Sequence, residues 1–149
     1  MNKNLTLIFI FFVLFCLNKI AMSHFTYIKT SIKNLTYLEK ALTQLNINFE
    51  KGSEKVNPRL IIPQENNHSI EFCWKNEEYA FVVDKSFWQQ RLSITGFLNN
   101  ITQQYACENV IGESQRTGFQ KNDNPQKLSD GSQTVTMERW NDNLVNSNW

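Results

Sequence analysis

Two neighbouring stretches of the sequence constrain the fold more than any other feature. In Ser69–Lys75, apolar residues recur at every second position (Ile70, Phe72 and Trp74), which predicts a strand with one buried face. The stretch Tyr79–Asp84 is rich in aromatic and β-branched residues, which predicts a second strand. A short polar segment separates the two strands, so we expect an antiparallel hairpin at the centre of the fold.

The segment before this hairpin predicts a strand, a helix and a second, shorter strand. Aromatic and β-branched residues favour a strand over Phe25–Ile32. Asn34 can then cap a helix, because its side-chain oxygen accepts from the free amides of the first turn. A short strand over Ile47–Phe49 is expected to follow. The leucines of the predicted helix have helical spacing, at Leu35, Leu38, Leu42 and Leu45.

A second helix is predicted after the central hairpin. We expect it to start between Leu92 and Gly96 and to run to Gln115, with Gly118 near its C-terminus. Its buried face is marked by Ile94, Phe97, Leu98, Ile101 and Tyr105.

The C-terminal part of the chain predicts one more hairpin. Asp130-Gly131 is a strong signal for a two-residue turn, and Thr134–Arg139 is the strand that leaves it. The strand before the turn is weaker, since Pro125 shortens it or confines it to an edge. The expected order is therefore β-α-β-β-β-α-β-β. This order predicts an α+β fold, a mainly antiparallel sheet with two helices packed on one face.

Length and composition suit one folded domain. The chain has 149 residues, of which 41% are hydrophobic and 13% aromatic, enough for a core of its own. We assign residues 22–140 to a single α+β domain and 141–149 to a polar tail. The formal net charge is +1, and the charges form no long run of one sign. This balance gives no strong signal for nucleic-acid binding.

The three cysteines do not form a metal or disulfide pattern. Cys16, Cys73 and Cys107 are odd in number and widely spaced, so we expect ordinary packed thiols. The two histidines, His24 and His68, have no companion at metal-ligand spacing. The sequence predicts no metal and no cofactor.

Residues 1–21 form an apolar N-terminal segment with three interpretations. The apolar run Leu5–Leu17 is too short to cross the hydrocarbon core of a bilayer as a helix and resembles the apolar part of a signal peptide. Its cleavage site would be poor, because Lys19 stands where a small residue belongs. The segment could therefore be an upstream in-frame extension of a protein that begins at Met22, a targeting signal or a membrane anchor. A membrane is expected as a partner only if residues 1–21 are retained.

Three stretches of the sequence resemble a known family. They are the opening Met22-Ser23-His24-Phe25 with the lysines that follow, the stretch from Phe97-Leu98 to Tyr105-Ala106, and the closing Asp130-Gly131 with Arg139-Trp140. Together they resemble the hypothetical chloroplast open reading frame thirty-five proteins of algal plastids and cyanobacteria. The resemblance implies a plastid (chloroplast) location and a start at Met22. It implies no activity, because the family has none assigned.

Three residues are candidates for binding. His24 opens the first strand and could act as a base or a ligand, although such a histidine more often packs at a strand end. Trp88 and Arg91 combine an aromatic and a basic side chain three positions apart, a combination typical of recognition surfaces. They would share a face if the second helix began early. The alternative is that Trp88 fills the join between sheet and helix.

Three functions remain open at this level. The leading hypothesis is an uncharacterised plastid-encoded protein, soluble and stromal, that acts as an accessory protein by binding another protein. The second is an enzyme with an unrecognised site built from His24, Asp84 and the second helix, for which no catalytic residue can be assigned. The third is a plastid protein attached to a membrane through residues 1–21.

Overall fold

The computed structural model describes residues 24–53 and 57–139. The interpretations of residues 1–21 and 141–149 lie outside the described residues. In chain order the elements are β1 (Phe25–Ile28), α2 (Leu35–Gln44), β2 (Glu50–Lys51), β3 (Arg59–Pro63), β4 (Ser69–Lys75), β5 (Glu78–Asp84), the 3₁₀ turn η1 (Lys85–Phe87), α3 (Ile94–Arg116), β6 (Gln120–Lys121), β7 (Gln126–Lys127), β8 (Gln133–Thr134) and β9 (Met137–Glu138).

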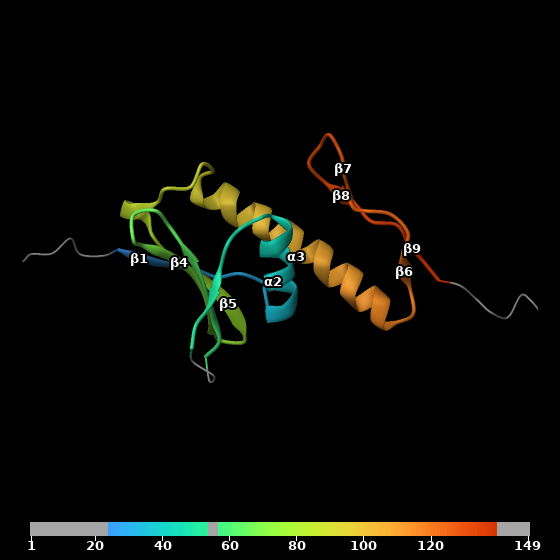
Figure 1. Cartoon of the computed structure of the whole chain (residues 1–149), viewed down its shortest axis with the longest axis horizontal. Coiled ribbons are helices and arrows are strands. Elements are labelled where there is room, and N and C mark those ends of the chain that lie inside the picture. The colour runs from blue at the N-terminus through green and yellow to red at the C-terminus, as the bar shows by residue number, and fades with distance from the viewer. Residues whose placement is uncertain (1–23, 54–56, 140–149) are drawn as a thin grey trace, which may run out of the picture.

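The core of the fold is a five-stranded sheet with both helices on one side. The strand order is β1-β5-β4-β3-β2, and every neighbouring pair is antiparallel. Figure 1 shows α2 and α3 together against one face of this sheet. The predicted α+β class, with two helices packed on one face of an antiparallel sheet, is confirmed.

The central hairpin forms as the alternation predicts. Phe72 of β4 lies opposite Phe81 of β5, both are completely buried, and their ring centroids are 5.1 Å apart. Asn76 and Glu77 both have positive φ, and Lys75 pairs with Glu78. The loop is therefore a two-residue turn of the kind that matches the twist of a hairpin. Glu78 belongs to the strand rather than to the turn.

The first helix has the predicted N-cap. The side-chain oxygen of Asn34 accepts from the backbone N–H groups of Thr36 (2.9 Å) and Tyr37 (3.4 Å). The hydroxyl of Tyr105 in α3 accepts from the backbone N–H groups of Lys33 and Asn34. These bonds join the start of α2 to the middle of α3.

The second helix begins inside the predicted interval. Ser93 caps it by accepting from the N–H of Gly96, and it ends at Arg116. Its 23 residues span about 34 Å at 1.5 Å per residue, so α3 extends beyond the sheet. Figure 1 shows residues 120–139, in orange and red, lying along this distal part.

The sheet differs from the prediction at three strands. β3 was not predicted, although Leu60 and Ile62 bury their side chains beside β4. β1 ends at Ile28 instead of Ile32, because the chain turns away where the Thr30 hydroxyl donates to the carbonyl of Tyr79. β2 forms at Glu50–Lys51 rather than at Ile47–Phe49.

The C-terminal hairpin also departs from the prediction. It consists of two separate ribbons, β6 with β9 and β7 with β8, and neither belongs to the five-stranded sheet. The N–H of Leu128 donates to the carbonyl of Ser132, which closes a three-residue loop in place of a two-residue turn. Gly131 takes the positive φ (86°) that such loops require at their last position.

Candidate functional site

The three predicted binding residues lie near one end of the sheet but form no single cluster. Phe25 pairs with Asp84, so His24 lies near the point where β5 passes into η1. Trp88 is the residue that follows η1. His24 and Arg91 are exposed, whereas Trp88 is half-buried. Because α3 begins at Ile94, Trp88 and Arg91 both precede the helix and do not share a helix face.

Trp88 packs as part of the core. Its indole meets the ring of Phe97 edge to face, with centroids 5.3 Å apart. Its Nε1–H donates to the carbonyl of Leu92 at 2.8 Å, which satisfies the polar end of the indole. This geometry matches the alternative in which Trp88 fills the join between sheet and helix.

The segment from η1 to α3 is held against the β3–β4 turn. The ring of His68 stacks on that of Phe87 at 3.7 Å, with 12° between the planes. The Asn66 side chain donates to the carbonyl of Phe87, and the N–H of Gln89 donates to the side chain of Gln64. These contacts fix the position of Trp88.

Asp84, the carboxylate of the enzyme hypothesis, has a structural role. It is 4% exposed and accepts from the backbone N–H of Ser86 at 2.9 Å, which caps η1. A carboxylate held in this way stabilises the turn after β5. The structure therefore explains the position of Asp84 without a reaction.

The cysteine of α3 is not poised as a nucleophile. Burial raises the pKa of the Cys107 thiol above its ordinary value of 9.0, and the nearby carboxylate of Glu108 adds to this effect. A catalytic cysteine needs the opposite shift, because the thiolate is the reactive form.

Within residues 24–53 and 57–139, no three His, Cys, Asp or Glu side chains gather as a metal would require.

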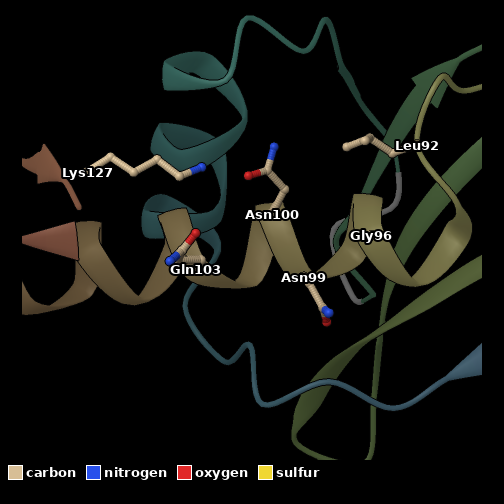
Figure 2. A pocket seen from close by; sticks show the side chains of 6 residues that line it. All are labelled: Leu92, Gly96, Asn99, Asn100, Gln103 and Lys127. Atoms are coloured by element: carbon tan, nitrogen blue, oxygen red, sulfur yellow. The ribbon is translucent and has the colours of Figure 1, made fainter. Parts of the chain in front are cut away.

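A hollow of about 590 Å³ lies over the N-terminal half of α3. Figure 2 shows Lys127 reaching from β7 along α3 toward Asn100. The lining offers amide donors and acceptors and one ammonium group, but no carboxylate, imidazole or thiol to act beside it. It consists of Leu92, Gly96, Asn99, Asn100, Gln103 and Lys127.

The face of the sheet opposite the helices carries a different set of side chains. We call it the open face, because α2 and α3 both lie on the other side (Figure 1). One row of paired residues crosses all five strands on this face. From β1 to β2 the row is Tyr27, Val82, Glu71, Ile61 and Glu50.

The β3–β4 side of the open face is polar and internally bonded. Glu71 accepts from the hydroxyl of Ser69 and the thiol of Cys73, and forms an ion pair with Arg59 at 3.7 Å. These contacts satisfy the carboxylate within the protein. A partner would have to break them to bind there.

The β1–β5 side of the open face is apolar and exposed. Phe25 and Tyr27 are 59% and 60% exposed, and Tyr27 pairs with the buried Val82 of β5, two residues from the buried Ala80. We call these four residues the aromatic patch. Lys75 lies over the ring of Tyr27, with its Nζ 4.9 Å from the centroid. The aromatic patch is the surface best suited to bind another macromolecule.

Sequence reasoning missed the aromatic patch. The signal was present, because Phe25 and Tyr27 alternate with Thr26 and Ile28 along one strand. Each face of this strand carries an aromatic or aliphatic residue, with Phe25 and Tyr27 on one face and Ile28 beside Thr26 on the other, so the alternation alone cannot tell which face the helices cover.

Comparison with known proteins connects the chain to one group. A profile of the family described as "Protein of unknown function (DUF1257)" matches residues 32–136. The chain is 49% identical over 122 residues to the uncharacterized protein ycf35 of Trieres chinensis, which covers 76% of this chain and 94% of the relative. It is 38% identical over 127 residues to the protein of the same name from Guillardia theta, with 80% and 98% covered. A third, from Pyropia yezoensis, is 35% identical over 130 residues.

Two further findings complete the comparison. No solved structure matches the chain. Of the helices in the described part of the chain, none is both long and apolar enough to span a bilayer.

Proposed function

The chain belongs to the DUF1257 family of uncharacterised ycf35 proteins, and on that premise we propose that it is a small accessory protein that acts by binding another protein. Its relatives are plastid proteins of algae, which gives the chain a plastid origin. The stroma as its compartment is part of this proposal.

The aromatic patch is the observation that carries the proposal. Phe25 and Tyr27 stand side by side on one strand with more than half of each side chain in water. Fully burying one large apolar side chain contributes about 1.5–3 kcal/mol. Two such residues on a rigid sheet are therefore able to anchor a partner, as aromatic residues do in interface hot spots.

Capture of a partner tests this proposal. The full chain, tagged at its C-terminus, is used to capture proteins from a plastid extract, and bound proteins are identified by mass spectrometry. We expect a partner in near-stoichiometric amount. We expect the variant with Phe25→Ser and Tyr27→Ser to lose it at unchanged melting temperature, since both side chains are largely exposed.

Val110→Ser supplies the matched control. Val110 is also an exposed apolar residue (55%), but it lies on α3, away from the open face. The Val110→Ser variant should capture the partner as the wild type does. Equal capture by the Phe25 and Tyr27 variant, or no stoichiometric partner at all, would contradict the proposal.

A further inference from the structure

The two edges of the five-stranded sheet differ in how they are protected. β2, at one edge, has two residues, both charged and exposed, and Lys51 forms an ion pair with Glu39 of α2 at 2.8 Å. Short length and charge are the usual means of preventing a sheet edge from pairing with another chain. β1, at the other edge, has four residues and contains no charge, Pro or Gly.

The β1 edge is open to a further strand. Among the described residues, β1 pairs with β5 alone. A strand has backbone donors and acceptors along both sides, so the outer side of β1 can pair with an extended segment. An added strand would place alternate side chains beside Phe25 and Tyr27 on the open face. The aromatic patch would thus become continuous with the new strand.

The charge around this edge is mainly positive. The stretch from His24 to Leu38 contains no Asp or Glu, but it contains Lys29 and Lys33. Lys75 adds a third ammonium group over the Tyr27 ring. Three acidic residues lie on β5 or in the turn before it: Asp84 is buried as the cap of η1, Glu78 is paired in register with Lys75, and Glu77 is exposed in the turn. The positive charge that no neighbouring strand offsets in register is therefore that of Lys29 and Lys33.

This charge decides between two occupants. A second copy of the chain, paired through its own β1, would bring a second edge that carries Lys29 and no carboxylate against the first. Like charges opposite each other in a sheet are unfavourable. A segment with carboxylates near Lys29 and Lys75 is attracted to these ammonium groups, whereas a second copy of the chain is repelled by them.

We infer that β1 is the docking edge for an extended acidic segment of another protein, which adds a sixth strand beside Phe25–Ile28. The segment has apolar side chains toward the aromatic patch and Asp or Glu residues near Lys29 and Lys75. This inference rests on the proposed function, since it names how and with what chemistry the partner binds.

Binding of a defined peptide to the full chain tests the inference. The probe is a short fluorescent peptide in which valine and threonine alternate between glutamates at both ends. We expect saturable binding by fluorescence anisotropy, and slower amide hydrogen exchange over Phe25–Ile28. A peptide with lysine in place of glutamate should bind about tenfold more weakly or worse. The same loss is expected when alternate peptide nitrogens on the pairing edge are methylated, because strand addition needs those N–H groups.

Two charge-reversal variants make the test specific. Lys29→Glu should weaken binding of the glutamate peptide and strengthen binding of the lysine peptide. Lys127→Glu is the control, because Lys127 is also an exposed lysine but lies on β7, outside the five-stranded sheet. This variant should bind both peptides as the wild type does.

Each remaining outcome overturns one claim. Strand addition is overturned if the methylated peptide binds as tightly as the unmethylated one, or if peptide binding leaves amide hydrogen exchange over β1 unchanged. Concentration-dependent self-association that Tyr27→Ser abolishes overturns the acidic partner in favour of a second copy. If a protein captured from plastid extract binds wild type and Lys29→Glu equally, the inference fails and the proposed function stands. If the peptide binds as expected but no protein is captured, the proposed function fails instead.

Discussion

Gly112 of α3 lies directly against the ring of Tyr37 in α2. A Cβ at position 112 would overlap the ring and hydroxyl atoms of Tyr37. The Tyr37 hydroxyl donates to the carboxylate of Glu113 at 2.9 Å, one residue further along α3. The two helices can cross this closely because residue 112 has no side chain.

Gly112→Ala should destabilise the protein by about 1–3 kcal/mol, because the added methyl group forces Tyr37 or the helix to move. Alanine normally stabilises a helix interior by about 1 kcal/mol relative to glycine, and about 1–3 kcal/mol is the net loss expected because the overlap involves three atoms of Tyr37. Denaturant unfolding followed by circular dichroism measures the difference.

Gly96→Ala is the control for this prediction, since Gly96 lies near the start of the same helix. Its nearest neighbour for a new Cβ is the Ser93 hydroxyl at 3.2 Å, which is small and can adjust. We expect a change within about half a kcal/mol. A Gly112→Ala variant as stable as wild type would show that the helices do not cross as described.

Phe72→Ala or Phe81→Ala should cost about 3–5 kcal/mol, because each removes a fully buried ring and leaves a cavity. Phe25→Ala removes the same atoms from an exposed position on β1 and should cost far less. Unfolding free energies of the three variants give the comparison. Similar losses in all three would mean that Phe25 is buried like Phe72 and Phe81, and a larger loss for Phe25→Ala would mean that the two faces of the sheet are assigned the wrong way round.

The central hairpin and both helices could be predicted because their signals are local. Alternation in β4 and the cap at Asn34 depend on residues close in sequence. β3 could not be predicted in the same way. Its apolar residues lie between Pro58 and Pro63, which suggest a loop, and its strand structure comes from pairing with β4.

Trp88→Ala should lower the unfolding free energy by about 2–4 kcal/mol, because the indole packs on Phe97 and bonds to the carbonyl of Leu92. Arg91→Ala should change it by no more than about half a kcal/mol, since Arg91 is exposed. Thermal unfolding and partner capture are measured together for both. A stable Trp88→Ala variant that no longer captures the partner would show that Trp88 is a recognition residue.

The candidate site was harder to predict than the fold. The sequence does not distinguish an exposed aromatic residue from a buried one, so it offers Trp88 both as a binding candidate and as a packing residue, and it predicts only a strand for Phe25 and Tyr27. Only the position of both helices on one face leaves Phe25 and Tyr27 in water and covers Trp88 in part. That position depends on contacts between distant segments, such as Tyr105 with Asn34.

Stability should fall in alkaline solution through Tyr37. Its hydrogen bond to the Glu113 carboxylate, together with burial, raises the pKa of the Tyr37 hydroxyl above its ordinary value of 10.0. The folded state then holds this proton more tightly than the unfolded state. The stabilisation is complete below pH 10 and is lost as the pH rises from 10 toward the higher pKa of the folded protein.

Tyr37→Phe is the variant that tests this dependence. It should be less stable than wild type at pH 7, because the bond to Glu113 is gone. Its unfolding free energy should also decline less steeply above pH 10, because the titrating group has been removed. Glu113→Gln should flatten the same decline, since it removes the negative charge that opposes ionisation of Tyr37. Denaturant unfolding at intervals from pH 7 to 11 measures all three slopes. Equal slopes for wild type and Tyr37→Phe would show that this hydroxyl does not control the alkaline stability.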